Sequence, residues 1–317
     1  MIKSEVMLLT GASGFIGSAF LRYALNLGWP VRALTRSPSS WSPQGCLEIV
    51  EGDFSRNTDW SRVLEGVKYV VHSAAEIRDP ALMPAVNVFG PQLMLEKAVD
   101  RGVKRWVQLS SVGSYGPVRC GVVNEDWPDN PSDPYEVSKT NFDDILKKAS
   151  RVHGIETCIV RPSNVYGQGM RNQSIQQLHR AIQKNYFAFI GPEGASANYV
   201  HVQDVVQALE LCVTHPRAAN QTYIVSAWTS MEEMVSGLSE GAGLITPSRR
   251  IPLPVATMLA RAMQWWPGFP LTLRRVRAMS LRSRYSTQKI ERELGWKLMI
   301  PVKEGVFDCT RDLCQLN

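Results

Sequence analysis

The chain has 317 residues, of which 44% are hydrophobic and 20% charged, and its formal net charge is +6. This is the composition of an ordinary globular protein. The charge is modest for the length and no nucleic-acid-reading motif accompanies it, so nucleic acid is not an expected partner. No apolar run approaches the roughly 20 residues of a membrane-spanning helix, so stable membrane insertion is not expected.

Short apolar segments alternate with helical patterns through the first 165 residues. The predicted strands are Val6–Leu9, Val31–Thr35, Leu47–Val50, Tyr69–His72, Trp106–Ser110 and Thr157–Arg161. The predicted helices between them are Phe15–Leu27, Trp60–Leu64, Pro91–Arg101 and Tyr135–His153. Strands this short, rich in Val, Ile and Leu and apolar on both faces, are typical of a parallel sheet that helices cover on both sides.

The alternation ends after Arg161. One helical stretch is expected near Ser174–Asn185, a helix start in Val200–Val213, a late strand at Gln221–Ser226 and a mostly helical tail from Ala227. We therefore expect an α/β fold with a Rossmann-type doubly wound parallel sheet. Residues 1–165 would form it, with 199–226 returning to it. Residues 166–198 and 227–317 would form a smaller, mostly helical C-terminal lobe that binds substrate.

A glycine-rich turn joins the first strand to the first helix. It reads Thr10-Gly11-Ala12-Ser13-Gly14-Phe15-Ile16-Gly17, with the spacing GxxGxxG. The first glycine would permit the tight turn, the second the approach of a pyrophosphate, and the third close packing of the helix on the sheet. Free N–H groups at the helix start favour the phosphates. The expected cofactor-binding residues here are Gly11, Ser13, Gly14, Phe15, Ile16 and Gly17.

The end of the second strand indicates which dinucleotide binds. An acidic residue at this place bonds the ribose 2′-hydroxyl of NAD. This chain has Thr35 there, followed by Arg36, whose guanidinium suits the 2′-phosphate of NADP. We therefore expect NADP as the cofactor. The alternative is NAD, bound without an acidic partner and with Arg36 solvated.

Tyr135 and Lys139 form a YxxxK motif at the start of a predicted helix, one turn apart on the same face. A nearby ammonium stabilises a phenolate, so Lys139 is expected to lower the pKa of Tyr135 from about 10. Tyr135 could then exchange a proton with a carbonyl or alcohol. Ser110 and Ser111 end a predicted strand at the edge where ligands meet such sheets, and could hold the substrate oxygen.

These motifs together resemble the extended short-chain dehydrogenase/reductases, the NAD-dependent epimerase/dehydratase-like branch that modifies nucleotide sugars. Besides the glycine turn and YxxxK, the resemblance rests on segments 51–53, 72–75, 87–90, 110–116, 161–167, 199–205 and 290–296, in the expected order. It covers almost the whole chain. It implies a Rossmann-type enzyme, and suggests a homodimer formed through the Pro91–Arg101 and Tyr135–His153 helices.

The resemblance also implies roles for individual residues. Ser111, Tyr135 and Lys139 would be catalytic, with Ser110 the alternative serine and Lys139 also holding the nicotinamide ribose. Six further residues would line the cofactor: Asp53, Phe54, Ala74, Ala75, Asn87 and Pro162. Of these, Asp53 would lie at the adenine. Substrate would meet Glu76, Ser111, Val112 and Asn164. Arg161 is expected to be structural, and His201 and Asp204 to serve capping and packing.

The choice of reaction depends on two places in the sequence. Related dehydratases carry an acid pair after the catalytic hydroxyl residue, whereas this chain has Val112-Gly113, so dehydration is not expected. Epimerases that resemble this chain usually hold NAD tightly. Arg36 suits NADP instead, and it therefore favours an NADP-dependent reductase of a 4-keto-hexose type nucleotide sugar. Tyr135 would donate the proton and Ser111 hold the oxygen. The alternatives are an NAD-dependent nucleotide-sugar epimerase and a reductase or dehydrogenase of a hydrophobic ketone, steroid- or flavonoid-like.

The basic and apolar segments of the C-terminal tail allow further interpretations of what the protein binds. Tail arginines could clamp a nucleotide diphosphate or form a solvated face. The apolar segment Leu253–Phe269, with Trp265-Trp266, could be lobe core, a hydrophobic ketone pocket or a shallow membrane contact. An NADP-sensing regulator or an RNA-binding scaffold is a further alternative, although such relatives commonly lose the Tyr or Lys. No CxxC pair or His cluster joins the six cysteines, so no metal is expected. The chain enters a strand with no signal-peptide pattern before it, and a cytoplasmic location is expected.

Overall fold

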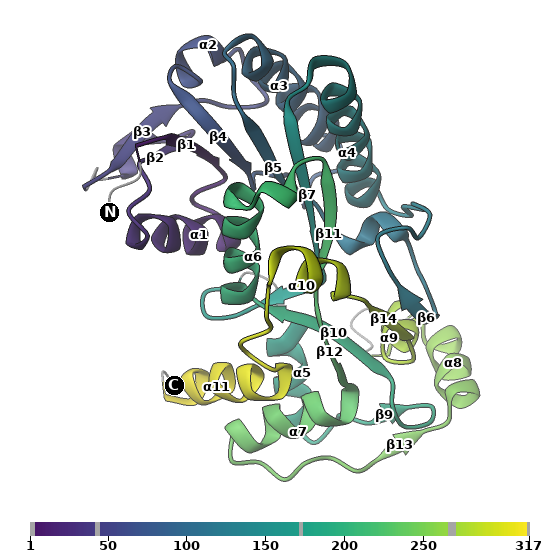
Figure 1. The fold of residues 1–317 in the computed structure, drawn as a ribbon. Coiled ribbons are helices and arrows are strands. Elements are labelled where there is room, and N and C mark those ends of the chain that lie inside the picture. The colour runs from purple at the N-terminus through teal and green to yellow at the C-terminus, as the bar shows by residue number, and fades with distance from the viewer. Residues whose placement is uncertain (1–3, 42–44, 171–173, 266–270, 316–317) are drawn as a thin grey trace.

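The fold is seen in a computed structural model of the chain, which describes residues 4–41, 45–170, 174–265 and 271–315. Trp266 and the end of the apolar segment that contains it lie outside these residues. The described chain forms a larger lobe around a central sheet and a smaller lobe below it, which carries the C-terminal helix (Figure 1).

A seven-stranded parallel sheet forms the centre of the larger lobe, in the order β11-β7-β5-β4-β1-β2-β3. Its strands are β1 (Val6–Thr10), β2 (Val31–Thr35), β3 (Leu47–Glu51), β4 (Val67–His72), β5 (Arg105–Leu109), β7 (Glu156–Pro162) and β11 (Gln221–Val225). Every predicted strand is present, within two residues of its expected bounds. The order reverses between β1 and β4, which is where ligands bind in open α/β sheets.

Helices cover both faces of this sheet. One face carries α1 (Phe15–Asn26), α6 (Val202–Thr214) and α10 (Gln288–Leu294). The opposite face carries α2 (Trp60–Val63), α3 (Gly90–Asp100) and α4 (Pro134–His153). Each layer buries its own apolar core against the strands, so the sheet is apolar on both sides. The predicted fold class, a doubly wound Rossmann-type sheet, is confirmed.

The helix start predicted within Val200–Val213 is placed wrongly at its beginning. Val200 and His201 belong to strand β10 (Ser196–His201), and α6 begins at Val202. β10 pairs with β8 (Asn164–Tyr166) and β12 (Ala227–Ser230). An apolar run of this kind fits a strand or a helix, and partners distant in the sequence decide between them. The His201 side chain accepts a hydrogen bond from the Gln203 amide at the start of α6.

The smaller lobe is largely helical, as expected, but also contains short strands that were not predicted. Its helices are α5 (Ser174–Gln183), α7 (Met231–Gly241), α8 (Leu253–Ala262), α9 (Leu273–Ala278) and α11 (Val302–Gln315). Two strand pairs join β9 (Phe189–Ile190) to β13 (Arg250–Ile251) and β6 (Cys120–Val123) to β14 (Arg282–Tyr285). Strands of two to four residues have no periodicity that would reveal them in a sequence.

None of the helices among the described residues is both long and apolar enough to cross a lipid bilayer. No three or more His, Cys, Asp or Glu side chains in the described ranges lie together as metal ligands would.

Candidate active site and dinucleotide site

The turn after β1 requires glycine at two positions. Gly11 has φ +71°, and a Cβ atom there would lie 2.6 Å from the backbone nitrogen of Ala74. A Cβ atom at Gly17 would overlap the carbonyl oxygen of Gly11. Gly11 therefore lets the turn approach the segment after β4, and Gly17 lets α1 lie directly against the turn.

The N-terminus of α1 has no protein cap. Gly14 is the N-cap residue, no side chain bonds the free N–H groups, and the first turn contains no acidic residue. Ser13 is exposed beside it, and Phe15 and Ile16 are half-buried in the first turn. Unsatisfied N–H groups and the positive end of a 12-residue helix lie next to the carboxyl end of β1. These groups fit the pyrophosphate of a dinucleotide.

The ends of β1 and β4 are held together by hydrogen bonds. The Thr10 hydroxyl lies 2.8 Å from His72 Nδ1, and the Ser73 hydroxyl donates to the Thr10 carbonyl at 2.6 Å. The Ala74 amide donates to the Thr10 hydroxyl at 3.2 Å. Ala74 and Ala75, both half-buried, are thereby fixed beside the glycine turn.

Arg36 is exposed directly after β2. Burial raises the pKa of Asp53, but hydrogen bonds from Ser55 and the charges of Arg36 and Arg56 hold it below its usual value. The Asp53 carboxylate accepts from the Ser55 amide and hydroxyl, both at 2.8 Å. Phe54 stacks on Trp60 with ring centroids 5.1 Å apart. Arg36 therefore lies within electrostatic reach of the predicted adenine residues.

Asn87 lies in the π-helical turn Ala85–Phe89 and is 2% exposed. Its amide oxygen accepts from the Glu76 amide at 2.7 Å, and its nitrogen donates to the Glu76 carbonyl and the Ser138 hydroxyl, each at 2.9 Å. Asn87 thus connects the segment after β4 to α4. The Glu76 carboxylate accepts from the Arg78 and Asp79 amides, which lower its pKa, so this predicted substrate residue is engaged within its own loop.

Tyr135 and Lys139 lie in the first two turns of α4. Asp133 and Glu136 close the helix start with a capping box, which fixes the position of this turn. Tyr135 is half-buried and Lys139 is 2% exposed. The described residues offer the Lys139 ammonium no hydrogen bond or ion pair. Burial lowers the pKa of Lys139 to about 8, against the opposing charge of Asp143. A buried, unpartnered ammonium fits a site that a ligand completes.

The expected lowering of the Tyr135 pKa is not found in the cofactor-free chain. Burial, followed by the negative charges of Asp143 and Asp133, raises the pKa of Tyr135 to about 12. The Lys139 ammonium lies one turn from Tyr135 on α4, but the buried Asp143 carboxylate lies two turns away, and the YxxxK motif does not include it. Tyr135 is therefore a phenol at neutral pH, which is the form that donates a proton.

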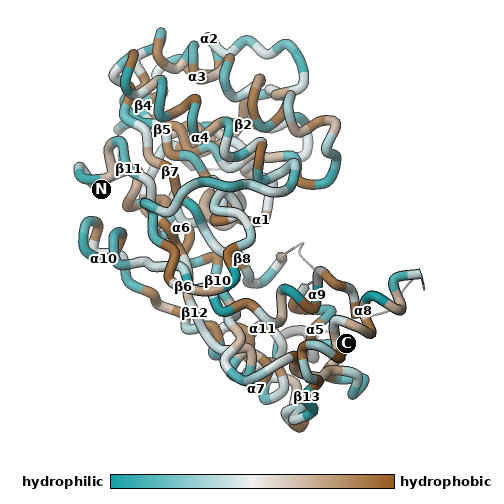
Figure 2. The backbone as a smooth tube through the Cα atoms, turned by 90° about the vertical axis from the view of Figure 1, so that its right-hand side faces the viewer, coloured by the Kyte–Doolittle hydropathy of each residue, from teal (hydrophilic) through white to brown (hydrophobic). Residues whose placement is uncertain are grey.

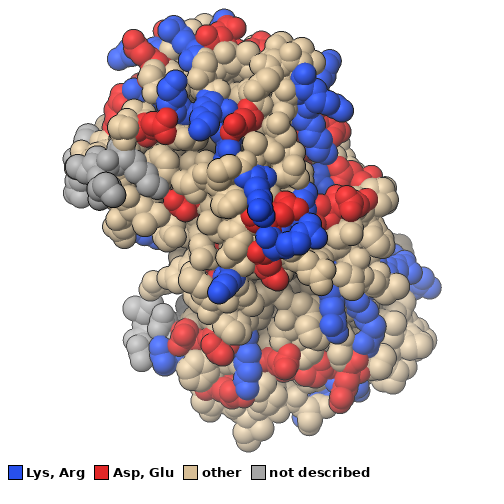
Figure 3. Space-filling view, viewed as in Figure 1, with Lys and Arg blue, Asp and Glu red and all other residues tan. Residues whose placement is uncertain are grey.

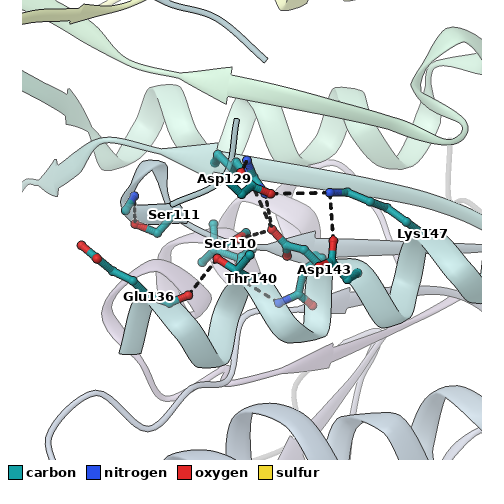
Figure 4. Close-up of polar contacts among 12 residues, drawn as sticks. Ser110, Ser111, Asp129, Glu136, Thr140, Asp143 and Lys147 are labelled. Carbon is teal, nitrogen blue, oxygen red and sulfur yellow. Dashed lines mark hydrogen bonds and ion pairs between the residues drawn. The ribbon is translucent and has the colours of Figure 1, made fainter. Parts of the chain in front are cut away.

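The two serines after β5 have different partners. Ser110 is buried and its hydroxyl donates to the Asp143 carboxylate at 2.7 Å. Ser111 is half-buried, and its hydroxyl accepts from the Gly113 amide at 3.0 Å (Figure 4). A Cβ atom at Gly113 would lie 2.8 Å from Glu136 Cγ, so this loop lies against the first turn of α4. Ser111, rather than Ser110, keeps a hydroxyl proton to donate beside that turn.

A buried charge network supports this region, and only Arg161 in it was foreseen as structural. Arg161 and Asp143 are 2% and 0% exposed and lie 3.0 Å apart. Arg161 also bonds both oxygens of Asp129, at 2.6 and 3.0 Å. Its guanidinium lies over the Tyr115 ring, 4.7 Å from the centroid. The signal for Asp143 was its place on the apolar face of α4, four residues after Lys139.

The remaining predicted residues line the ends of β7 and β8. Pro162 is buried at the end of β7, and Asn164 is exposed at the start of β8 with its amide nitrogen 3.2 Å from the Asn198 carbonyl. Val112 is half-buried in the loop after Ser111. His201 and Asp204 hold backbone amides at the start of α6 and before α11, as their expected capping and packing roles require.

The predicted residues therefore form two groups along one edge of the sheet. Arg36 and Asp53 follow β2 and β3, whereas Ser111 follows β5 and Tyr135 begins α4. β1 and β4 lie between the groups, and three strand spacings separate β2 from β5 by about 14 Å. The glycine turn lies between the two groups, and a dinucleotide extended across it would have its adenine end at Arg36 and its nicotinamide end at Tyr135.

Comparison with known proteins identifies the family of the chain. The sequence model of the NAD dependent epimerase/dehydratase family matches residues 7–226. The chain is 29% identical to UDP-glucose 4-epimerase of Vibrio cholerae over 78% of its own length and 79% of the relative's. It is 32% identical to dTDP-glucose 4,6-dehydratase of Streptomyces griseus, over 75% and 78%. A 3 beta-hydroxysteroid dehydrogenase/Delta 5-->4-isomerase of Mycobacterium tuberculosis is 24% identical, over 96% and 89%.

Among solved structures, MoeE5 in complex with UDP-glucose and NAD superposes with a TM-score of 0.75 at 26% identity. The superposition covers 99% of this chain and all of the other. The family match spans well over half of the chain and includes the glycine turn, the Ser111 loop and the Tyr135–Lys139 pair. This chain belongs to the NAD dependent epimerase/dehydratase family and is an enzyme of the extended short-chain dehydrogenase/reductase fold.

Proposed function

We propose that the protein is an NADP-dependent reductase of a keto group on a nucleotide-linked sugar, of the 4-keto-hexose type. The cofactor would supply a hydride. Tyr135 would donate a proton to the carbonyl oxygen, Ser111 would hold that oxygen, and Lys139 would bind the cofactor ribose and keep Tyr135 in place. A relative and a solved neighbour named for UDP-glucose support the substrate class. The cytoplasm is the proposed location, where reduced cysteines persist.

The observation that carries the choice of NADP is Arg36. It stands exposed after β2, where NAD sites place an acidic residue, and Thr35 before it carries no charge. Asp53 and Glu76 are both within electrostatic reach of Arg36, and Arg56 lies 3.8 Å from Asp53. A 2′-phosphate would pair with the Arg36 guanidinium, whereas the ribose hydroxyl of NAD would have no acidic partner there.

The raised pKa of Tyr135 fits reduction, because a phenol is already present at neutral pH to protonate the carbonyl oxygen. Dehydration is disfavoured by the loop after Ser111. Gly113 lies against Glu136 without space for a side chain, and the Glu136 carboxylate is engaged by Ser132 and Asp133. A nucleotide-sugar 4-epimerase is the second candidate, and the similarity to UDP-glucose 4-epimerase favours it.

The first test is to purify the protein without added cofactor, denature it and identify any released nucleotide. A reductase that exchanges its cofactor should release none, and should then bind NADPH more tightly than NADH and consume it with a 4-keto nucleotide sugar. Stoichiometric NAD retained through purification would contradict the reductase and favour the epimerase.

Replacing Arg36 by alanine should weaken NADPH binding by about 10- to 100-fold, the effect of losing a hydrogen bond to a charged group. NADH binding should change little, because NADH lacks the 2′-phosphate. Titration of both cofactors measures the difference. Arg56→Ala is the matched control, since Arg56 is exposed and also faces Asp53, 3.8 Å away. Equal weakening of NADPH and NADH by Arg36→Ala would refute the assignment.

We also propose a homodimer formed through α3 and α4. Leu93 and Val152 on these helices are 55% and 63% exposed, and a groove of about 390 Å³ runs between the helices. Burial of these faces against a second copy would remove both side chains from water. Light scattering of the native chain should give twice the monomer mass, and Leu93→Glu with Val152→Glu should halve it. A monomeric native chain would refute the dimer.

A further inference from the structure

Helix α8 of the smaller lobe turns its large apolar side chains outward. Ala256 and Ala260 are buried, and they pack with Val276 of α9. Met258 and Leu259, by contrast, are 62% and 38% exposed. A surface helix of a globular protein normally does the reverse and buries its larger apolar side chains. The exposed side of α8 is therefore an apolar face with no partner among the described residues.

The apolar face continues on both sides of these two residues. Leu253 and Val255 are exposed at the start of α8, and Trp265, three residues beyond its end, is 84% exposed. A shallow groove of about 660 Å³ runs along the helix, lined by Leu253, Pro254, Thr257, Met258, Arg261 and Ala262. α8 and α9 lie at the outer edge of the smaller lobe (Figure 2). Tryptophan beside an exposed apolar helix is typical of a membrane–water boundary.

The stretch of sequence that contains α8 and α9 has charges of one sign, although Arg250 at its start pairs with Glu232. Residues 241–290 contain nine of the 35 Lys and Arg residues and none of the 29 Asp and Glu residues. The rest of the chain therefore has 26 basic and 29 acidic residues, so the net positive charge of the protein comes from this segment. Arg261 and Arg277 are exposed, and neither has an acidic partner in the described ranges. The surface at the outer edge of the smaller lobe, near α8, is largely uncharged, with blue and red patches beside it (Figure 3).

We propose that this surface docks the enzyme onto an anionic phospholipid bilayer. The α8 surface comprises Leu253, Val255, Met258, Leu259, Trp265, Arg261 and Arg277. Its apolar side chains would enter the boundary between headgroups and acyl chains, and the two arginines would contact anionic headgroups. α8 has ten residues and is about 15 Å long, so it lies in the boundary and does not cross it.

The combination of features favours a lipid surface over other anionic partners. A free nucleotide or a nucleic acid would use the arginines but would leave Met258, Leu259 and Trp265 in water. A bilayer with anionic headgroups accommodates both, because it presents charge at its surface and hydrocarbon below it. The proposal rests on the α8 surface alone and does not depend on the assignment of cofactor or substrate.

Flotation of the full-length protein with vesicles tests the proposal. The native chain should bind phosphatidylcholine vesicles containing phosphatidylglycerol, and salt should weaken this binding. Met258→Glu with Leu259→Glu should abolish it. Arg261→Gln with Arg277→Gln should weaken it by about 25-fold, because each basic residue near an anionic surface contributes about fivefold. Binding to pure phosphatidylcholine should not change with the arginine pair.

Leu298→Glu is the matched control, because Leu298 is 40% exposed in the segment between α10 and α11, away from α8. It should bind vesicles like the native chain. Brominated phosphatidylglycerol should quench the fluorescence of the native protein, and Trp265→Phe should reduce that quenching. Thermal unfolding confirms that each variant is folded. The proposal is overturned if the native chain does not float with anionic vesicles, if Met258→Glu with Leu259→Glu still does, or if this pair instead halves the mass in solution.

Discussion

Tyr135→Phe should lower kcat of carbonyl reduction by about two to four orders of magnitude, the usual contribution of a positioned proton donor. Phenylalanine keeps the ring on α4 and removes only the hydroxyl. The cofactor groups, from the glycine turn to Lys139, are unchanged, so the Kd for the reduced cofactor should stay the same. Steady-state turnover and fluorescence titration of the cofactor measure the two quantities separately.

Tyr186→Phe is the control for this substitution, because Tyr186 is 78% exposed. It should leave turnover unchanged. Retained activity in Tyr135→Phe would remove the tyrosine from the mechanism. Loss of cofactor binding in the same variant would instead show that the substitution disturbs the fold of the site. A chain that binds the cofactor but turns over no substrate in either form would favour a regulatory protein over an enzyme.

The direction of the pH profile follows from the two pKa values. Burial raises the pKa of Tyr135 to about 12 and lowers that of Lys139 to about 8. Tyr135 therefore carries its proton throughout the neutral range, whereas Lys139 loses its positive charge first as the pH rises. If the Lys139 ammonium binds the ribose, reduction should slow as the pH rises through about 8.

Local signals in the sequence predict the cofactor turn and the catalytic helix well. Both are recognised from motifs that span only a few residues: the glycines at 11, 14 and 17, and the YxxxK spacing. The strands of the central sheet can also be predicted from the sequence, because burial on both faces makes them continuously apolar. Strands outside the central sheet, such as β10 and β14, are not, since their partners lie far away in the sequence and their own patterns fit other structures.

The raised pKa of Tyr135 could not be predicted from the YxxxK motif alone. The YxxxK motif places a positive charge beside the tyrosine, but the pKa also depends on burial and on Asp143, two turns along α4. Asp143 is buried because Arg161 reaches it from β7, 18 residues away in sequence, and Asp129 takes the other side of the same guanidinium. A contact of this kind follows from the packing of α4 on the sheet and not from spacing within a motif.

Asp143→Ala should destabilise the protein by about 3–5 kcal/mol of unfolding free energy, the usual cost of removing one member of a buried ion pair. The substitution would leave Arg161 buried with Asp129 alone and would remove the acceptor of the Ser110 hydroxyl. Asp144→Ala is the matched control. Asp144 is the next residue, its side chain is 66% exposed, and its ion pair with Lys147 should contribute less than about 1 kcal/mol. Urea unfolding measures both, and equal small losses would contradict the prediction.

The isosteric Asp143→Asn separates the electrostatic role of this carboxylate from its structural one. The negative charge of Asp143 raises the pKa of both Tyr135 and Lys139. Its neutralisation should lower both pKa values and move the alkaline fall of reduction to lower pH. A purely structural residue would lower stability without moving that profile. A pH profile unchanged in Asp143→Asn would therefore restrict Asp143 to holding α4 against Arg161, whereas a shifted one would show that the buried carboxylate sets the pH range in which Tyr135 and Lys139 act together.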